Sequence, residues 1–190
     1  MTDGIKPIRR VVTGNDAKGR SCVLYDGPAP GVKESAFKKG TGMTDIWMFE
    51  TCPAPISGDR DDGNLPFHFE PPATGGRLRV VQSEPKPADY DPAQDTYITP
   101  EHPPRRTEGG TWERGRQSLY TTRIHKSETV DYGILLSGER VLITDAGEHA
   151  LKPGDVVVQL GSWHAWSDRN YGSQMAFVMM AAKFDDSGNG

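Results

Sequence analysis

The stretch that decides the fold is residues 125–168, which reads HKSETVDYGILLSGERVLITDAGEHALKPGDVVVQLGSWHAWSD. Short runs rich in β-branched and aromatic residues alternate in it with turn-forming sequences such as Ser-Gly, Asp-Ala-Gly and Pro-Gly-Asp. The runs recur every 8–12 residues or so, which is typical of an all-β sandwich or barrel. The strands predicted here and just outside are 117–125, 129–136, 140–144, 148–151, 156–160, 163–167 and 174–183.

The first half of the chain carries shorter and more widely spaced β-type runs. These are residues 8–13, 21–25, 45–51 and 77–83. Residues 57–64 read as an exposed loop, and the proline-rich residues 85–106 read as a long loop that is either a functional flap or mobile. We therefore expect three parts: 1–109 as N-terminal strands and a proline-rich loop packing on a barrel, 110–184 as the barrel core, and 185–190 as a polar tail.

Composition excludes several classes of protein. The 26 Asp and Glu residues outnumber the 22 Lys and Arg residues, so the basic face of a nucleic-acid-binding protein is not expected. No run approaches the ~20 apolar residues of a membrane-spanning helix. The N-terminus, MTDGIKPIRR, lacks the apolar segment of a signal peptide, and we expect Cys22 and Cys52 to be reduced. A cytoplasmic protein that contacts neither nucleic acid nor membrane is the expectation.

Two histidines and one aspartate on predicted strands suggest a metal site. Side chains two residues apart share a strand face, so positions 125, 127, 129 and 131 point the same way unless a bulge intervenes. His125 and Asp131 would then face the interior together, and His164 would join them from a second hairpin. Two imidazoles and one carboxylate form a common divalent-metal site.

At this point the sequence resembles the cupin superfamily. The first cupin motif usually reads Gly, five residues, His-x-His, three or four residues, Glu, six residues, Gly. Here the corresponding residues are His125, Ser127, Asp131 and Gly138. The second motif is matched by LKPGDVVVQ at residues 151–159 and by His164, which is separated from Asp168 by three residues. The resemblance covers roughly residues 118–183 and implies a cupin-type jelly-roll β-barrel with an N-terminal strand extension.

The start of the chain extends this resemblance more weakly. It looks like a branch of small single-barrel cupin-domain proteins, mostly of unknown function, whose fungal relatives include cupin-domain oxidoreductases of biosynthetic pathways. Family members commonly pair through their N-terminal strands, so the resemblance also implies a homodimer.

The departures from the motif bear on the metal. Cupins typically hold a divalent ion with three His and one Glu, so the resemblance implies His125, Asp131 and His164 as ligands here. Ser127 stands where the second His would be, and a hydroxyl is a poor ligand beside imidazole. Fewer protein ligands mean weaker binding and more positions open to substrate or water. Iron, nickel, manganese and zinc all remain candidates, since imidazole and carboxylate do not choose among them.

Other residues of the motif region are candidates for contact with a substrate. His164 is the candidate catalytic residue, and the candidate substrate-binding residues are Ser127, Trp166, Arg123 and Tyr120. Each has a structural alternative. Trp166 can be core, Arg123 a solvated charge, Asp131 a residue that fixes a hairpin backbone, and His125 the remnant of a metal site.

Three functions are compatible with these residues. The first is a metal-dependent oxygenase, isomerase or decarboxylase acting on a small organic substrate in an internal cavity. The second is a metal-free module that binds a small-molecule ligand with a degenerate cupin metal site. The third is a metal-free acid–base enzyme in which His164 is the base and Asp131 orients it.

Overall fold

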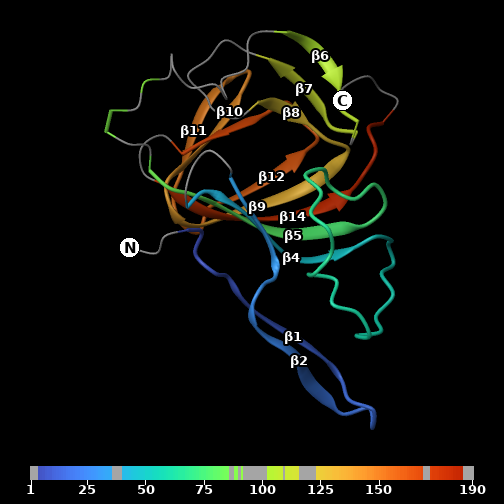
Figure 1. The fold of residues 1–190 in the computed structure, drawn as a ribbon. Helices are drawn as coiled ribbons and strands as arrows, with labels where there is room; N and C mark the ends of the chain where they lie inside the picture. Colours follow the sequence, from blue (N-terminus) through green and yellow to red (C-terminus); the bar gives the residue numbers. More distant parts are fainter. Residues whose placement is uncertain are drawn as a thin grey trace.

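The computed structural model describes residues 4–35, 40–85, 88–89, 91, 102–108, 110–115, 123–168 and 172–185 of the 190-residue chain. In these ranges the chain forms strands and turns and contains no helix (Figure 1). The predicted all-β class is therefore confirmed. Among the described residues there is accordingly no helix of the length and apolarity that crossing a membrane requires.

The strands follow the turn chemistry of the sequence. Val156–Leu160, for example, is a β-branched run between a Pro-Gly turn and Gly161, and it forms a strand with the predicted bounds. The early strands are β1 (Arg9–Asn15), β2 (Ser21–Pro28), β3 (Gly31–Glu34), β4 (Gly42–Phe49) and β5 (Gly76–Ser83). The later strands are β6 (His102–Arg106), β7 (Trp112–Gly115), β8 (Ile124–Lys126), β9 (Thr129–Gly138), β10 (Arg140–Thr144), β11 (Gly147–Leu151), β12 (Val156–Leu160), β13 (Ala165–Ser167) and β14 (Ser173–Ala181).

Three of these strands were not predicted. β3 and β7 are only four residues long, too short to show a clear pattern of alternation. β6 lies inside the region expected to be a loop and contains Pro103 and Pro104, where its register with β7 is interrupted. A proline cannot donate a ladder hydrogen bond, so two consecutive prolines argue against a strand at this position. Most of the predicted strand 117–125 lies outside the described residues.

One wall of the molecule is a six-stranded antiparallel sheet in the order β12-β9-β14-β5-β4-β3. β14 lies between β9 and β5 and pairs with both along most of its length. Strands from the two halves of the chain therefore share one sheet, and β3 to β5 extend the part formed by β9, β12 and β14.

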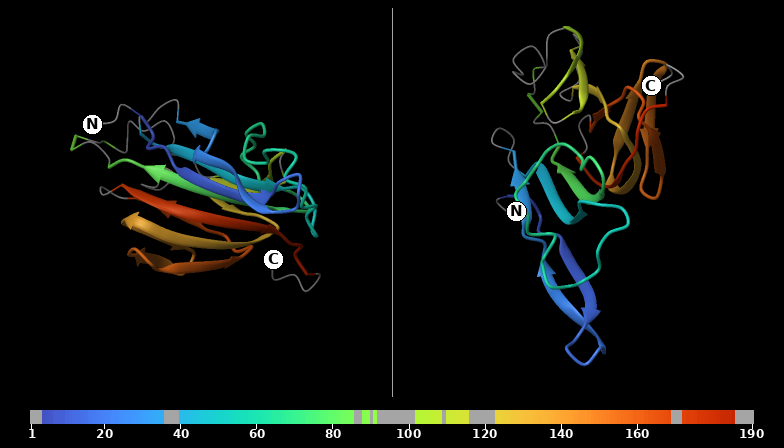
Figure 2. Two further views of the ribbon diagram at one scale, coloured as in Figure 1. Left: turned by 90° about the horizontal axis from the view of Figure 1, so that it is seen from below. Right: turned by 90° about the vertical axis from the view of Figure 1, so that its right-hand side faces the viewer.

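The opposite wall consists of two three-stranded sheets, β11-β10-β13 and β6-β7-β8. An isolated bridge between His125 and His164 joins β8 to the residue that precedes β13. Figures 1 and 2 show this wall lying over the six-stranded sheet, so that the two walls face each other as in a jelly roll. The expected jelly-roll fold with N-terminal strands is therefore confirmed.

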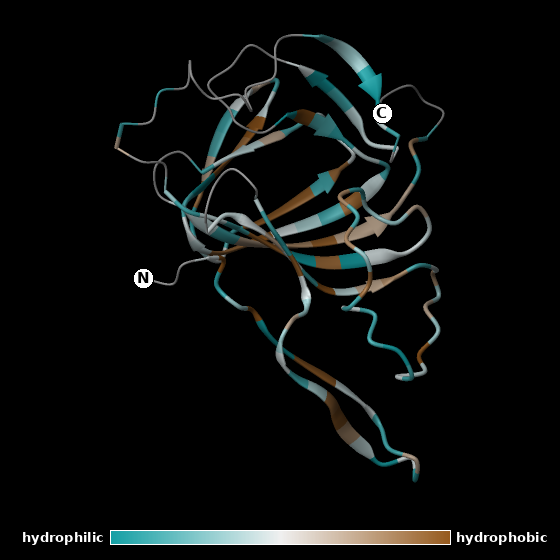
Figure 3. Ribbon diagram, viewed as in Figure 1, coloured by the Kyte–Doolittle hydropathy of each residue, from teal (hydrophilic) through white to brown (hydrophobic). Residues whose placement is uncertain are grey.

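The core lies between the walls. On the six-stranded sheet, buried Leu135, Met175 and Phe177 project from β9 and β14 and pack with Trp166 of the opposite wall. Gly133 lies directly across from Phe177, and a side chain there would meet the Met175 and Phe177 side chains. Figure 3 shows the resulting alternation of apolar and polar residues along these strands.

The outer face of the same sheet is apolar and exposed at one edge. Val158 of β12 lies opposite Tyr132 of β9, and both side chains are about half exposed. The neighbouring exposed residues on these two strands are Leu136, Val156 and Leu160.

The β1–β2 hairpin projects away from the two walls (Figures 1 and 2). At its base the buried Arg10 forms a two-pronged ion pair with Asp61, and its guanidinium lies over the rings of Tyr25 and Trp47. An isolated two-stranded hairpin is only marginally stable in water. These contacts fix its base to the body of the protein.

Two glycines with similar backbone angles allow the crowding at the tight turn that ends β9 to be tested. Gly138 and Gly19 have nearly the same positive φ, 76° and 74°, but a Cβ at Gly138 would collide with the backbone of Gly172 and Ser173, whereas nothing surrounds Gly19. We expect Gly19→Ala to cost about 1 kcal/mol for its left-handed backbone alone. Gly138→Ala should cost about 3 kcal/mol or more, because crowding adds to this strain. Equal losses in urea unfolding would contradict the crowding seen here.

Candidate functional site

The central feature of the site is a pair of imidazoles. The His125 N–H donates to the His164 carbonyl at 2.9 Å, and the His164 N–H donates to the His125 carbonyl at 3.0 Å. Directly paired residues place their side chains on the same face. The two ring centroids are therefore only 4.3 Å apart, with an interplanar angle of 55°. His164 is buried, and His125 is partly exposed.

Backbone carbonyls fix the tautomer of both rings. His125 Nδ1 lies 2.9 Å from the Arg123 carbonyl, and His164 Nδ1 lies 2.9 Å from the Ser162 carbonyl. A carbonyl can only accept, so each Nδ1 carries the proton and each neutral ring keeps a lone pair on Nε2. The contact of His164 Nδ1 is thus with the Ser162 carbonyl, whereas the acid–base alternative assigned the orienting role to Asp131.

Both imidazoles are neutral near pH 7. Burial lowers the pKa of His125, and it lowers the pKa of His164 to about 3, helped by the proximity of His125. A base with so low a pKa accepts a proton weakly at neutral pH. The pair is therefore better suited to donate its Nε2 lone pairs to a Lewis acid than to act as a general base.

Aromatic rings connect the pair to the core. His164 meets Trp166 edge-on with centroids 5.9 Å apart, and Trp166 meets Phe177 edge-on at 5.4 Å. The buried Arg140 guanidinium lies over the Trp166 ring. Trp166 therefore lies beside His164, as its position two residues later predicts, and it is also part of the core.

Contrary to the expectation from the sequence, Asp131 does not lie with the two histidines. His125 belongs to β8 in one wall and Asp131 to β9 in the other, because the chain leaves the first sheet after Lys126 and enters the second at Thr129. Residues 125–131 are therefore not one strand. The rule that side chains two residues apart share a face does not apply between His125 and Asp131, because they lie on different strands. Within the described ranges, no three His, Cys, Asp or Glu side chains cluster closely enough to hold a metal ion.

Asp131 instead belongs to a line of polar groups on the six-stranded sheet. Thr129 hydrogen-bonds to the Asp131 carboxyl, and the Ser127 and Thr129 hydroxyl oxygens are 2.7 Å apart. Since Thr129 donates its proton to the carboxylate, Ser127 must donate to Thr129. Burial raises the pKa of Asp131 to about 6. The Ser127 hydroxyl is thus engaged within this line.

Glu113 is a neighbour of the pair that sequence reasoning missed. It lies on β7 directly opposite His125, is buried, and forms ion pairs with Arg105 and Arg123 at 2.7 Å each. These arginines hold the pKa of Glu113 below its ordinary value despite burial. Nothing in a four-residue strand marks this position in the sequence.

Arg123 and Tyr120 were two further candidates for contact with a substrate. The Arg123 side chain is more than half exposed and is engaged by Glu113, so it has an internal counter-charge. Tyr120 lies outside the described residues.

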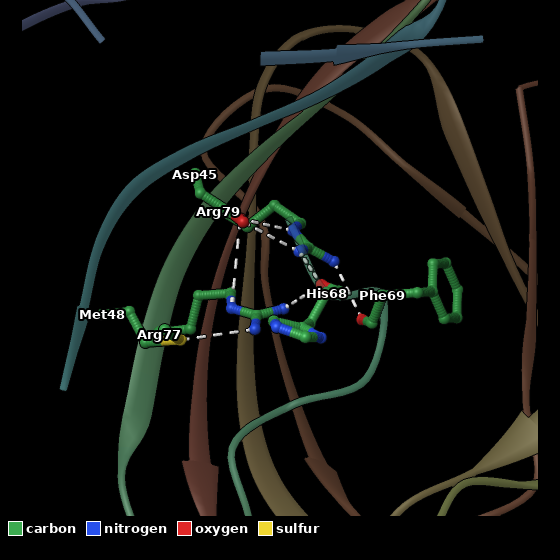
Figure 4. A network of polar contacts seen from close by, with 6 residues as sticks. All are labelled: Asp45, Met48, His68, Phe69, Arg77 and Arg79. Carbon is green, nitrogen blue, oxygen red and sulfur yellow. Dashed lines mark hydrogen bonds and ion pairs between the residues drawn. The ribbon is translucent and has the colours of Figure 1, made fainter. Parts of the chain in front are cut away.

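Two buried arginines on the inner face of β5 were also missed. Arg79 donates to both oxygens of Asp45 at 2.6 and 3.0 Å, and Arg77 and Arg79 both donate to the His68 carbonyl (Figure 4). Burial lowers the pKa of Arg77 to about 10. The two guanidiniums fasten the segment around residues 67–69 against the inner face of the sheet, with Arg79 also lying over the Phe67 ring.

The raised pKa of Asp131 makes a prediction about stability. Between pH values of about 4 and 6 the folded protein holds this proton more tightly than the unfolded chain does, so its free energy of unfolding falls as pH rises through that window. The Asp131→Asn variant cannot ionise at this site. Relative to it, the wild type should lose about 1–3 kcal/mol between roughly pH 4 and pH 7.5 in urea unfolding with chelator present. Parallel pH profiles for the two proteins would mean that Asp131 titrates normally.

Comparison with known proteins places the chain among its relatives. No protein-family model matches it. It is 44% identical over 63 residues to phomopsin biosynthesis cluster protein C' of Diaporthe leptostromiformis, covering 32% of this chain and 33% of that one. It is 31% identical over 128 residues to oryzines biosynthesis cluster protein J of Aspergillus oryzae, covering 62% and 65%. The matches thus span about a third and just under two thirds of these relatives.

A third relative names the fold family. The chain is 46% identical over 44 residues to the cupin-domain-containing oxidoreductase virC of Hypocrea virens, covering 23% of each chain. Among solved structures, a putative ethanolamine utilization protein Q from Salmonella typhimurium aligns over 94% of this chain and 99% of its own, with 9% identity and a TM-score of 0.41. The Schizosaccharomyces pombe Cnp3 cupin domain aligns over 92% and 83%, with 9% identity and a TM-score of 0.37. The resemblance to the cupin superfamily that the two sequence motifs indicated is confirmed by the similarity to this cupin-domain-containing oxidoreductase.

Proposed function

We propose that this protein is an enzyme that acts on a small organic substrate in a biosynthetic pathway, with a divalent metal held by His125 and His164. The observation that carries the proposal is the pair of adjacent, neutral imidazoles, each anchored through Nδ1. The relatives named for biosynthesis clusters and for an oxidoreductase support the pathway and the reaction class.

The two rings fit a metal in their chemistry. A metal binds imidazole only in its neutral form, and metal-bound histidines almost always donate their other ring N–H to a carbonyl, carboxylate or water. Both conditions hold for His125 and His164 before any ion is present. With two protein ligands, the remaining coordination positions would be open to water or substrate. Iron, nickel, manganese and zinc all accept imidazole.

The surrounding residues would prepare the site for chemistry. A bound ion would supply Lewis-acid or redox chemistry toward a substrate oxygen. The Ser162 and Arg123 carbonyls hold the rings in one tautomer, and Trp166 and Phe177 keep an apolar surface beside His164. This apolar surface would favour an organic substrate and limit the access of water.

Metal content tests this proposal. After loading with iron(II), nickel, manganese or zinc one at a time, we expect about one equivalent of at least one metal in the wild type. Loss of a group that only hydrogen-bonds to a metal ligand costs about 10–100-fold in metal affinity. His125→Ala and His164→Ala remove a ligand itself, so each should lose at least that much metal affinity. His149→Ala is the matched control, because His149 is an exposed residue of β11. Equal metal content in all four proteins would refute the proposed ligands.

A metal-free binding module is the second candidate. It is favoured because, among the described residues, no group of three His, Cys, Asp or Glu side chains could hold a metal ion. If it holds, the wild type takes up no metal under any loading condition. A small-molecule ligand then raises the thermal unfolding midpoint by the same amount with and without chelator.

A further inference from the structure

Two buried polar side chains face each other on the inner surface of the six-stranded sheet without meeting. Asp131 of β9 and Gln159 of β12 are direct partners in the strand register. Their exposed fractions are 7% and 5%. Asp131 Oδ1 and Gln159 Nε2 are nevertheless both buried and have no hydrogen-bond partner within the described structure.

Such a pair needs an explanation. An unpaired polar group removed from water costs about 1–3 kcal/mol, and native proteins rarely keep one without a water, ion or ligand to satisfy it. The buried Arg77 Nε in the same cross-strand row is also unpaired, but Asp45 Oδ1 lies 4.0 Å away and accounts for it electrostatically. Among the residues that the structure describes, no such counterpart is seen for the Asp131–Gln159 pair.

The unsatisfied atoms have complementary chemistry. Gln159 Nε2 can only donate, and an ionised Asp131 Oδ1 can only accept. The Asp131 carboxyl already accepts a hydrogen bond from Thr129, but its Oδ1 atom accepts none and is available to another donor. A group placed between the two must therefore accept one hydrogen bond and donate another. A carboxylate only accepts, and beside Asp131 it would also be repelled.

We propose that Asp131 and Gln159 form a subsite for a substrate group that both donates and accepts a hydrogen bond, namely an amide or an alcohol. The inference deepens the proposed function by naming a substrate class. It assigns Asp131 to the substrate, whereas the sequence motif assigns it to the metal. The neighbouring inward side chains, Met179 and Val157, are apolar and suit a hydrocarbon portion of the same molecule.

Acetamide and acetate provide a test, because they have nearly the same shape and differ in whether they can donate. Nuclear magnetic resonance of the side-chain amide groups of the full chain reads out the site directly. The Gln159 amide signals are identified by their loss in Gln159→Leu. Those of Gln174, a residue of β14 whose amide already donates to Gln82 at 2.8 Å, serve as the control and are identified in Gln174→Leu.

We expect acetamide to shift the Gln159 signals saturably and the Gln174 signals little. Acetamide should bind about 10-fold more tightly than acetate, or more, because acetate leaves Asp131 unpaired and adds a like charge. In Asp131→Asn, a nearly isosteric change, both side chains can donate, so the preference for acetamide should disappear. Equal binding of the two probes to the wild type, no saturable shift with acetamide, or an unchanged preference in Asp131→Asn would each overturn the proposal.

The test separates this subsite from the metal proposal. The titrations are run with chelator, so a failure of His125 and His164 to bind metal leaves the result unaffected. Conversely, Gln159→Leu should take up metal as the wild type does, and a protein that binds metal but does not distinguish acetamide from acetate refutes only the subsite.

Discussion

The structure depends on one backbone contact, the reciprocal hydrogen bonds between His125 and His164. They connect the β6-β7-β8 sheet to the β11-β10-β13 sheet and so complete the wall that faces the six-stranded sheet. The same contact sets the two imidazoles side by side, because directly paired residues must share a face. Fold closure and site assembly are therefore the same physical event in this protein.

The sequence predicted the class of fold and the later strands well. Strands such as β10 and β12 are bounded by Gly and Pro turns and rich in β-branched residues, so local chemistry determines them. The imidazole pair was anticipated from the predicted strands and from the cupin resemblance. The separation of Asp131 from it was not, because a change of sheet at Ser127 and Glu128 leaves no mark in a two-residue alternation. Arg77 and Gln159 matter through cross-strand neighbours that are distant in the chain, Asp45 and Asp131, which no local pattern can reveal.

The interior combines two kinds of surface that usually exclude each other. Leu135, Met175 and Phe177 form an apolar core against Trp166, while Arg77, Arg79 and Asp45 lie on the same inner face of the sheet. Burying charge is costly unless it is paired and hydrogen-bonded. Here backbone carbonyls of His68 and Phe69 supply part of that pairing, so the N-terminal half of the chain satisfies the charges that its own strand β5 brings into the interior.

The His125–His164 bridge also bears on how such a protein can evolve. The backbone hydrogen bonds between the two residues set the position of the rings. The length of chain that connects His125 to His164 therefore does not affect that position. The β10–β11 hairpin and the turn before β12 can therefore gain or lose residues without displacing either imidazole. A lineage built in this way can diversify its surface loops while inheriting the same pair of histidines.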